Sequence, residues 1–476
     1  MSFTSLEFLL FLGLCLSLLH ATRGLSVRTW LLVLFSYIFS LTFGIGGLAL
    51  VTFLAVVSFA IGGKIGTAES DRARERWLWL GLCVNLLPLA FFKYSNFIAS
   101  NVAILLHPLG FNVRVPANVV LPIVGVSYFT FTAMSYLLDV YNGKIEPSHS
   151  VGEYLCYIAY FPKLIAGPIV RAADFLPQFR RGFQVTAEDI EVGFGYFLVG
   201  AVKKLVIADH LAGHVSMIMA SPQHYNAATL LQGVIGFTVQ LYADFSGYSD
   251  MAIGCARLMG LKLPQNFLMP FSSINIAEFW RRWHITMSTW FRDYVFLPLE
   301  IGSRGMRSAL VRAARNILIT MLLCGLWHGA SWNFVLYGGV HGVALAVYQL
   351  YSRVRQARSV APSAFHLGTL GARTLTLSVV LLSNVLFATR TLPAAFTYFN
   401  RLLTWSSDGV SLGSPYILPL TALVVVAHLF INKDRNLIEE VSNYSMPIRI
   451  FAYSTLLFAL TALVASEAVP FVYVRF

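Results

Sequence analysis

Charged residues are scarce in this chain. Lys, Arg, Asp and Glu together make up 12% of its 476 residues, whereas hydrophobic residues make up 57%. Soluble globular domains carry about 25% charged residues, so the composition excludes a soluble protein and favours an all-α membrane protein that crosses the bilayer many times. Nothing in the sequence indicates a nucleic-acid partner.

Several familiar catalytic and binding motifs are also missing. The chain contains no GxSxG elbow, no GxxxxGK[ST] phosphate loop and no HExxH zinc motif. Its five cysteines form no CxxC pair and predict no disulfide framework. His210 and His214 have a spacing that could hold a metal, but no third ligand is evident, so we expect a polar helix end and no metal site.

Long uncharged runs predict about a dozen transmembrane or re-entrant helices, each spanning helix needing about 20 apolar residues. Residues 29–63 carry no charge; as one helix they would extend roughly 50 Å, so we predict two helices hinged at residues 43–47. The start of the chain carries Glu7 and no basic stretch, so we expect a retained first helix rather than a cleaved signal peptide. The loops are too short for a separate domain, so residues 1–476 are predicted to form one.

Basic residues are concentrated in a few loops. The net charge is +12, and the densest basic runs are residues 64–76, 303–315 and 352–359. Cytoplasmic loops of membrane proteins carry an excess of Lys and Arg. We therefore predict that all three runs face the cytoplasm, where they also contact anionic lipid.

One apolar stretch, residues 160–171, is interrupted in a way that a lipid-facing helix would not tolerate. Pro162, Lys163, Gly167 and Pro168 fall within it. Irregular backbone at membrane depth persists only where protein buries it or water reaches it. We expect a re-entrant turn or the lining of an internal cavity, with a surface loop as the alternative.

A second stretch, residues 240–254, places Asp244 and Asp250 in an apolar run. Carboxylates within a membrane are costly and normally face the protein interior with a partner. We favour a structural role for both, as helix caps or in a salt bridge to an arginine such as Arg281 or Arg292, over direct chemistry.

Residues 279–299 follow a helical period that predicts one amphipathic helix. One face carries the large apolar residues Trp280, Trp283, Met287 and Trp290. The other carries the polar residues Arg281, His284, Ser288 and Arg292. An interfacial helix would explain the tryptophans and arginines, but it gives no reason for a histidine at the seam of the two faces.

His328 lies in the longest uncharged stretch of the second half, between Arg315 and Arg353. An ionisable group in a membrane segment is a candidate functional residue. Its neighbours Trp327, Ser331, Trp332 and Asn333 favour a lined site over a packed helix. The pairs Gly325/Gly329 and Gly338/Gly342 are typical of helices that approach closely. His341 is interpreted as a buried histidine bonded to nearby backbone.

Four motifs make the sequence similar to a known family: FPKLIAGPIVR, YADFSGYSDMAIG, NFLMPFSSINIAEFWRRWHITMSTWFRDYVFLPL and GLWHGASWNFVLYGGVHG. They resemble the membrane-bound O-acyltransferase family, in the bacterial branch that includes the alginate O-acetylation membrane protein. The best-matching core is residues 119–341. The resemblance implies a ring of irregular helices around a central funnel, with His328 and His284 as the catalytic histidines.

The resemblance also implies a function. An acetyl group would pass from a cytoplasmic thioester donor, acyl-CoA (acetyl-CoA above all) or a phosphopantetheine carrier, to an exported polysaccharide at the bacterial inner membrane. A histidine base without a serine or cysteine nucleophile indicates direct transfer between two bound substrates, and no tightly bound cofactor is expected. The acetyl group would go to the polymer directly, or to a serine of an extracytoplasmic esterase-like partner that completes the reaction. Alternatives are D-alanyl transfer to teichoic acid and, from another class, a transporter or flippase.

The candidate substrate-binding residues are polar or aromatic and lie in or beside these motifs: Asn333, Trp327, Trp332, Asp244, Ser288, Arg281, Arg292, Arg304 and Arg307. Asn333 and His284 are the candidates for stabilising the oxyanion. The arginines of residues 281–315 are predicted to bind the donor phosphates. One departure falls here, because Glu300 and Ile301 stand where the branch has small residues.

Overall fold

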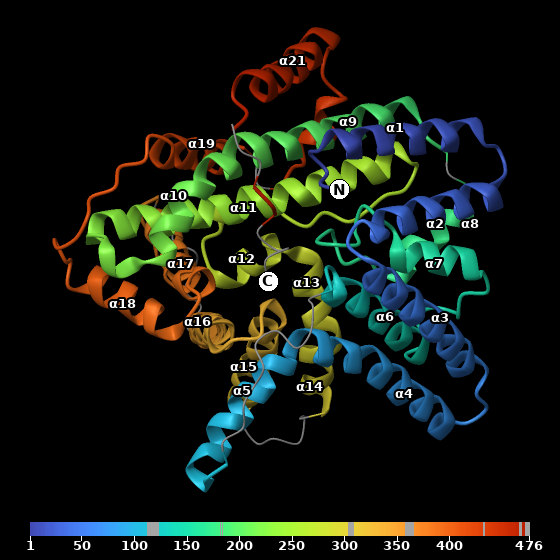
Figure 1. The fold of residues 1–476 in the computed structure, drawn as a ribbon, viewed down its shortest axis with the longest axis horizontal. Coiled ribbons are helices and arrows are strands. Elements are labelled where there is room, and N and C mark those ends of the chain that lie inside the picture. Colours follow the sequence, from blue (N-terminus) through green and yellow to red (C-terminus); the bar gives the residue numbers. More distant parts are fainter. Residues whose placement is uncertain are drawn as a thin grey trace. The chain divides into compact units, whose positions relative to one another are not determined.

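The computed structural model describes residues 1–111, 123–180, 182, 184–302, 309–357, 366–431, 434–465 and 469–471. Within this part of the chain the regular elements are helices (Figure 1). Five are long and apolar enough to cross a membrane: Ile45–Thr67, Asp71–Leu109, Ala309–His328, Trp332–Arg355 and Gly368–Ala388. Four shorter apolar helices accompany them: Leu6–Ala21, Leu25–Leu41, Ile417–Phe430 and Met446–Ala462. The predicted all-α, multi-pass architecture is confirmed.

The chain forms two compact units. The first comprises residues 1–197 and 251–264, and the second residues 198–250 and 265–476. Whether they act as one domain, as the sequence predicts, stays a prediction. The first unit contains α1 (Leu6–Ala21), α2 (Leu25–Leu41), α3 (Ile45–Thr67), α4 (Asp71–Leu89), α5 (Ser95–Leu106), α6 (Val126–Tyr141), α7 (Val151–Ala159), α8 (Ala172–Arg180) and most of α9 (Ala187–Val202).

The second unit carries the predicted catalytic residues. It contains most of α11 (Ala227–Leu258), together with α10 (Asp209–Ala220), α12 (Ile276–Arg282), α13 (Ile285–Phe291), α14 (Leu297–Gly302), α15 (Ala309–His328), α16 (Trp332–Ala357), α17 (His366–Ala388), α18 (Leu392–Leu403), α19 (Ile417–Phe430), α20 (Leu437–Val441) and α21 (Met446–Ala462).

The predicted hinge at residues 43–47 is confirmed. Helix α2 ends at Leu41 and α3 begins at Ile45. Gly44 has a φ of 107° between them, a backbone conformation that glycine adopts without a steric penalty. The uncharged run is therefore two helices.

Residues 160–171 form a buried turn between α7 and α8. Every residue from 160 to 170 is buried. The Tyr157 hydroxyl donates to the Val170 carbonyl oxygen at 3.0 Å, and the Phe161 amide donates to Ser36 Oγ at 3.1 Å. These bonds satisfy polar groups that the broken backbone would otherwise leave without partners. The surface-loop alternative is wrong, whereas the re-entrant turn and the lining of an internal cavity stay predictions.

Helices α15 and α16 form a tightly packed hairpin. A Cβ atom added at Gly325 would overlap the Phe334 carbonyl oxygen, and one added at Gly338 would overlap the Met321 carbonyl oxygen. Only glycine permits backbones to approach this closely, so the interpretation of these glycines as packing positions is confirmed. The hairpin places His328 at its closed end.

The single amphipathic helix predicted for residues 279–299 is wrong. Helix α12 ends at Arg282 and α13 begins at Ile285, and His284 between them has a φ of 43°. The break is flanked by two backbone hydrogen bonds to residues 268 and 266. Leu268 N donates to Arg282 O at 2.9 Å, and Ile285 N donates to Asn266 O at 2.9 Å. The interfacial interpretation fails as well, since Trp280, Trp283 and Trp290 are all buried.

Candidate active site

His284 lies at the junction of α12 and α13 and is completely buried. Its ring meets Phe245 of α11 edge-on, with ring centroids 4.7 Å apart, and stacks near Phe267 at 6.3 Å. Its Nδ1 atom is 3.1 Å from Oδ1 of Asn266. The histidine that the helical period placed at a seam is therefore held by a hydrogen bond inside an aromatic cage.

His328 is the last residue of α15 and is 3% exposed. Its ring lies 5.8 Å from that of Tyr337 and 5.3 Å from that of Phe387, both in edge-on geometry. These two aromatics come from α16 and α17, so His328 is enclosed by three helices. Charge is costly in such surroundings, which suit a neutral imidazole.

Trp327 brings the two histidines together. The centroid of its indole is 5.7 Å from the His284 ring and 5.1 Å from the His328 ring. The sequence predicted both histidines separately, and the structure places both imidazoles against one buried indole. Trp327 therefore forms the wall that the two histidines share.

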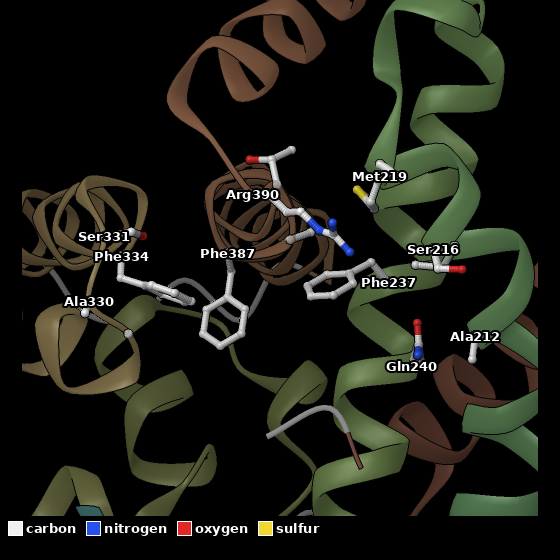
Figure 2. Close-up of a pocket in the computed structure, with 15 residues that line it drawn as sticks. Ala212, Ser216, Met219, Phe237, Gln240, Ala330, Ser331, Phe334, Phe387 and Arg390 are labelled. Atoms are coloured by element: carbon white, nitrogen blue, oxygen red, sulfur yellow. The ribbon is translucent and has the colours of Figure 1, made fainter. Parts of the chain in front are cut away.

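A pocket of about 530 Å³ lies next to the end of α15 (Figure 2), and neither histidine is among its lining residues. Two neighbours of His328, Gly329 and Phe387, belong to the pocket lining. Figure 2 shows the α15–α16 turn, with Ser331 and Phe334, on one side and Gln240 of α11 on the other. The remaining polar groups of the lining include Ser216, Thr389 and Arg390.

Arg390 supplies the positive charge of this pocket. It follows the end of α17, is exposed, and extends its guanidinium toward the side formed by Phe237 and Met219 (Figure 2). Gln240 is 6% exposed and presents its amide in the same wall. An apolar pocket with a few converging polar groups is the usual form of a small-molecule site. A ligand with an anionic group would suit this one.

Three further candidates near the histidines lie in different settings. The Asn333 amide donates to Thr389 O at 2.9 Å and to Thr389 Oγ1 at 3.1 Å, so it fastens the end of α17. Trp332 is 52% exposed and does not join the cluster. Ser288 donates to Trp283 O at 3.2 Å and bridges the break before α13.

Asp244 and Asp250 have lysine partners, not the arginines that the sequence suggested. Asp244 is 2.8 Å from Lys204 Nζ, and Asp250 is 2.6 Å from Lys203 Nζ. A carboxylate in an apolar interior needs such a partner. The predicted salt bridges are present with lysines in place of the predicted arginines, and the structural role of the two aspartates stays a prediction.

The arginines predicted to bind the donor have different settings in the described part of the chain, and donor binding by them stays a prediction. Arg281 is exposed, and Arg292 is exposed and paired with Asp293. Arg312 donates to Glu300 at 2.8 Å. Arg304 and Arg307 lie outside the described residues. Glu300, the departure from the family pattern, therefore holds α14 against α15.

The structure also shows the surroundings of two other histidines named in the sequence analysis, His341 and His210. His341 is bonded to a side chain, Ser383 Oγ at 2.9 Å, and not to backbone as expected. The His210 ring packs edge-on against Tyr416 at 5.0 Å. Among the described residues, no three His, Cys, Asp or Glu side chains lie close enough to hold a metal ion.

Sequence reasoning missed Asn266, Gln240 and Arg390. Asn266 opens the longest of the quoted motifs, yet no local pattern ties it to a histidine 18 positions later. Gln240 begins the apolar run that contains Asp244, and an uncharged amide in such a run is a weaker signal of a functional site than a carboxylate. Arg390 follows α17, the last of the five helices long and apolar enough to cross a membrane, and an arginine at a helix end has the ordinary explanation of a membrane boundary.

Comparisons with known proteins agree with the motifs. The profile of the family described as MBOAT, membrane-bound O-acyltransferase family, matches residues 74–388. Probable alginate O-acetylase AlgI of Pseudomonas aeruginosa is 40% identical over 349 residues, covering 73% of this chain and 66% of that protein, just under two thirds of its length. Peptidoglycan O-acetyltransferase of Helicobacter pylori is 33% identical over 369 residues (72% and 68%). Teichoic acid D-alanyltransferase of Bacillus subtilis is 26% identical over 302 residues (62% and 74%).

Proposed function

Since the chain belongs to the membrane-bound O-acyltransferase family, we propose that it transfers an acetyl group from a cytoplasmic thioester to hydroxyl groups of an exported polysaccharide. The family implied by the motifs is thereby confirmed. The polysaccharide acceptor is suggested by the name of the Pseudomonas relative. One observation supports the chemistry above all: the rings of His284 and His328 both contact the Trp327 indole, and two neighbours of His328, Gly329 and Phe387, line a pocket.

The hairpin supports opposite sides for the two substrates. Helix α15 carries Arg312 and Arg315 in its first turns and ends at His328, roughly 20–24 Å from those arginines at ~1.5 Å per residue. Helix α16 returns and carries Arg353 and Arg355 in its last turns. If the basic ends face the cytoplasm, the pocket opens on the outer side, where an exported polysaccharide would reach it. The bacterial cytoplasmic membrane is the location that fits this arrangement.

In the proposed reaction, His328 takes the proton from the acceptor hydroxyl as its oxygen attacks the thioester carbonyl. The C–S bond then breaks and the C–O ester bond remains. The proton passes from His328 to the leaving thiolate, so the products are an ester and a free thiol. His328 thus serves as a general base, a role typically worth 10²–10⁴-fold in rate.

The donor is proposed to be acyl-CoA, acetyl-CoA above all, or a phosphopantetheine thioester on a carrier protein. Its phosphates suit the guanidinium groups of exposed arginines, of which Arg281 and Arg292 are described. The acetyl group goes to the polymer directly or through the serine of an extracytoplasmic esterase-like partner. The Bacillus relative supports D-alanyl transfer as a second candidate. Identifying the acylated product that disappears in a deletion strain separates the two.

The decisive experiment measures transfer of radiolabelled acetyl from acetyl-CoA in membranes that contain His328→Gln. Glutamine keeps hydrogen-bonding capacity and similar volume but is not basic, so we expect a loss of 10²–10⁴-fold. The matched control is His341→Gln, which changes another buried histidine of the same hairpin and should retain transfer. Near-normal turnover of His328→Gln would refute the general base, and a transporter would not form the ester at all.

A separate experiment tests which side of the membrane each end of the α15–α16 hairpin faces. In a variant without the five native cysteines, a cysteine at Ser331 should react with a membrane-impermeant maleimide added outside the cell. One at Arg353 should react only after the membrane is opened. The reverse pattern would exchange the donor and acceptor sides.

A further inference from the structure

Asn266 forms several hydrogen bonds with residues 284–286, around His284. It is 1% exposed and lies in the segment between α11 and α12. Its backbone oxygen accepts from Ile285 N at 2.9 Å. Its side-chain Oδ1 accepts from Thr286 Oγ1 at 2.9 Å and from Thr286 N at 3.3 Å, and its Nδ2 donates to Ser249 Oγ at 3.1 Å. The amide is therefore held from both ends.

These bonds determine which end of the amide faces His284. An asparagine oxygen and nitrogen are distinguished by their partners. The backbone N–H of Thr286 can only donate, so the amide atom it meets must be Oδ1, which can only accept. The same Oδ1 is 3.1 Å from His284 Nδ1. A hydrogen bond between these two atoms requires that Nδ1 carry the hydrogen.

We propose that Asn266 is a positioning residue that holds His284 as the tautomer protonated at Nδ1. In a neutral imidazole the second nitrogen, Nε2, then carries a lone pair and accepts hydrogen bonds. In this tautomer Nε2 of neutral His284 has no hydrogen to donate. It therefore cannot stabilise the oxyanion of the reaction by a hydrogen bond, which was one of the roles predicted from the sequence. It serves as an acceptor for a substrate hydroxyl, a role that rests on the proposed transfer reaction.

The backbone at His284 supports a role for the side chain itself. Its φ of 43° lies in the left-handed region, a conformation that is unfavourable for a residue other than glycine and persists only if the surroundings impose it. Here the bonds from Leu268 and Ile285 on either side impose it. Glycine would relieve the strain, so a histidine at this position indicates a use for the imidazole.

The test is the ¹⁵N spectrum of histidine-labelled protein in lipid nanodiscs, with His284 assigned by its loss in His284→Gln. We expect a protonated Nδ1 and an unprotonated Nε2. Asn266→Asp keeps an oxygen acceptor, with Ser249 turning to donate, so it should keep this tautomer and shift the Nδ1 signal downfield. Asn266→Leu should lose the fixed tautomer. The control Thr286→Val removes a different bond to the same Oδ1 and should leave the tautomer unchanged.

Acetyl transfer by the same variants separates this inference from the proposed function. We expect Asn266→Asp to keep kcat within about tenfold, whereas Asn266→Leu loses kcat with little change in the donor KM. An Nε2-protonated His284, or an unchanged spectrum in both Asn266 variants, would overturn the inference whatever the activity. If Asn266→Leu does not fold, the Asn266→Asp spectrum decides alone. The expected spectra without any transferase activity would uphold the tautomer and refute the proposed reaction.

Discussion

Replacing Lys204 with methionine should destabilise the second unit without touching the proposed chemistry. Lys204 Nζ lies 2.8 Å from Asp209 Oδ1 and 2.8 Å from Asp244 Oδ1, and the three side chains are only 2%, 1% and 2% exposed. It also donates to the Val469 carbonyl oxygen at 2.6 Å. Methionine keeps the length and the apolar stem but removes the charge that both carboxylates share.

The size of the effect follows from this burial. Removing one partner of a buried ion pair costs about 3–5 kcal/mol, because it leaves a charge without compensation. At an unfolding entropy of about 2.1 cal/mol/K per residue, a 476-residue chain that unfolds cooperatively would lose roughly 3–5 °C in its unfolding midpoint. The loss should shrink when Asp244→Asn is added, since one of the two carboxylates is then neutral.

Tryptophan fluorescence during heating of the detergent-purified protein measures the midpoint. The matched control is Lys203→Met. Lys203 pairs with one carboxylate, Asp250, and is 22% exposed, so less than half of the shift is expected. A Lys204→Met protein with an unchanged midpoint and lost acetyl transfer would refute the structural role of this cluster and assign it to the chemistry.

Three further predictions concern the pocket, the hairpin and the α14 contact. Arg390→Gln should raise the KM for an anionic polysaccharide several-fold with little change in kcat, and it should leave the KM for a neutral acceptor unchanged. An equal rise in KM for both acceptors would show that Arg390 does not bind the anionic group of the acceptor. Gly338→Ala should lower the unfolding midpoint, because the added methyl group meets a backbone oxygen of α15. In the control Gly339→Ala the methyl group meets only a leucine side chain at 3.6 Å, so the midpoint should not change. Equal midpoints for the two variants would contradict the close packing of α15 and α16. A hydrogen bond from Arg312 lowers the pKa of Glu300 in the folded protein. This contact therefore stabilises the protein above the ordinary pKa of about 4.3, and the stabilisation is lost as the pH falls through the lowered pKa of the folded state. Glu300→Gln should weaken the dependence of the unfolding free energy on pH in this acidic range, and an unchanged dependence would show that the contact contributes nothing.

Local chemistry determined much of this protein in advance. The scarcity of charge fixes the membrane class, since charged groups cannot be left in lipid. The hinge at Gly44 and the buried turn at residues 160–171 follow from chain length and from proline and glycine, which act on the backbone where they stand. The close approach at Gly325 and Gly338 follows from the absence of a side chain. His328 was found because an imidazole is out of place in a long apolar run.

The tertiary structure alone decided how these parts meet. The helical period of residues 279–299 gave no sign of the break at His284, because the bonds that impose it come from Asn266 and Leu268, in another segment. The lysine partners of Asp244 and Asp250 come from before α10, far along the chain. The pairing of the two histidines depends on Trp327, whose contact with His284 spans two elements. Periodicity reports only neighbours within a few turns, whereas the site is made by contacts between segments that folding brings together.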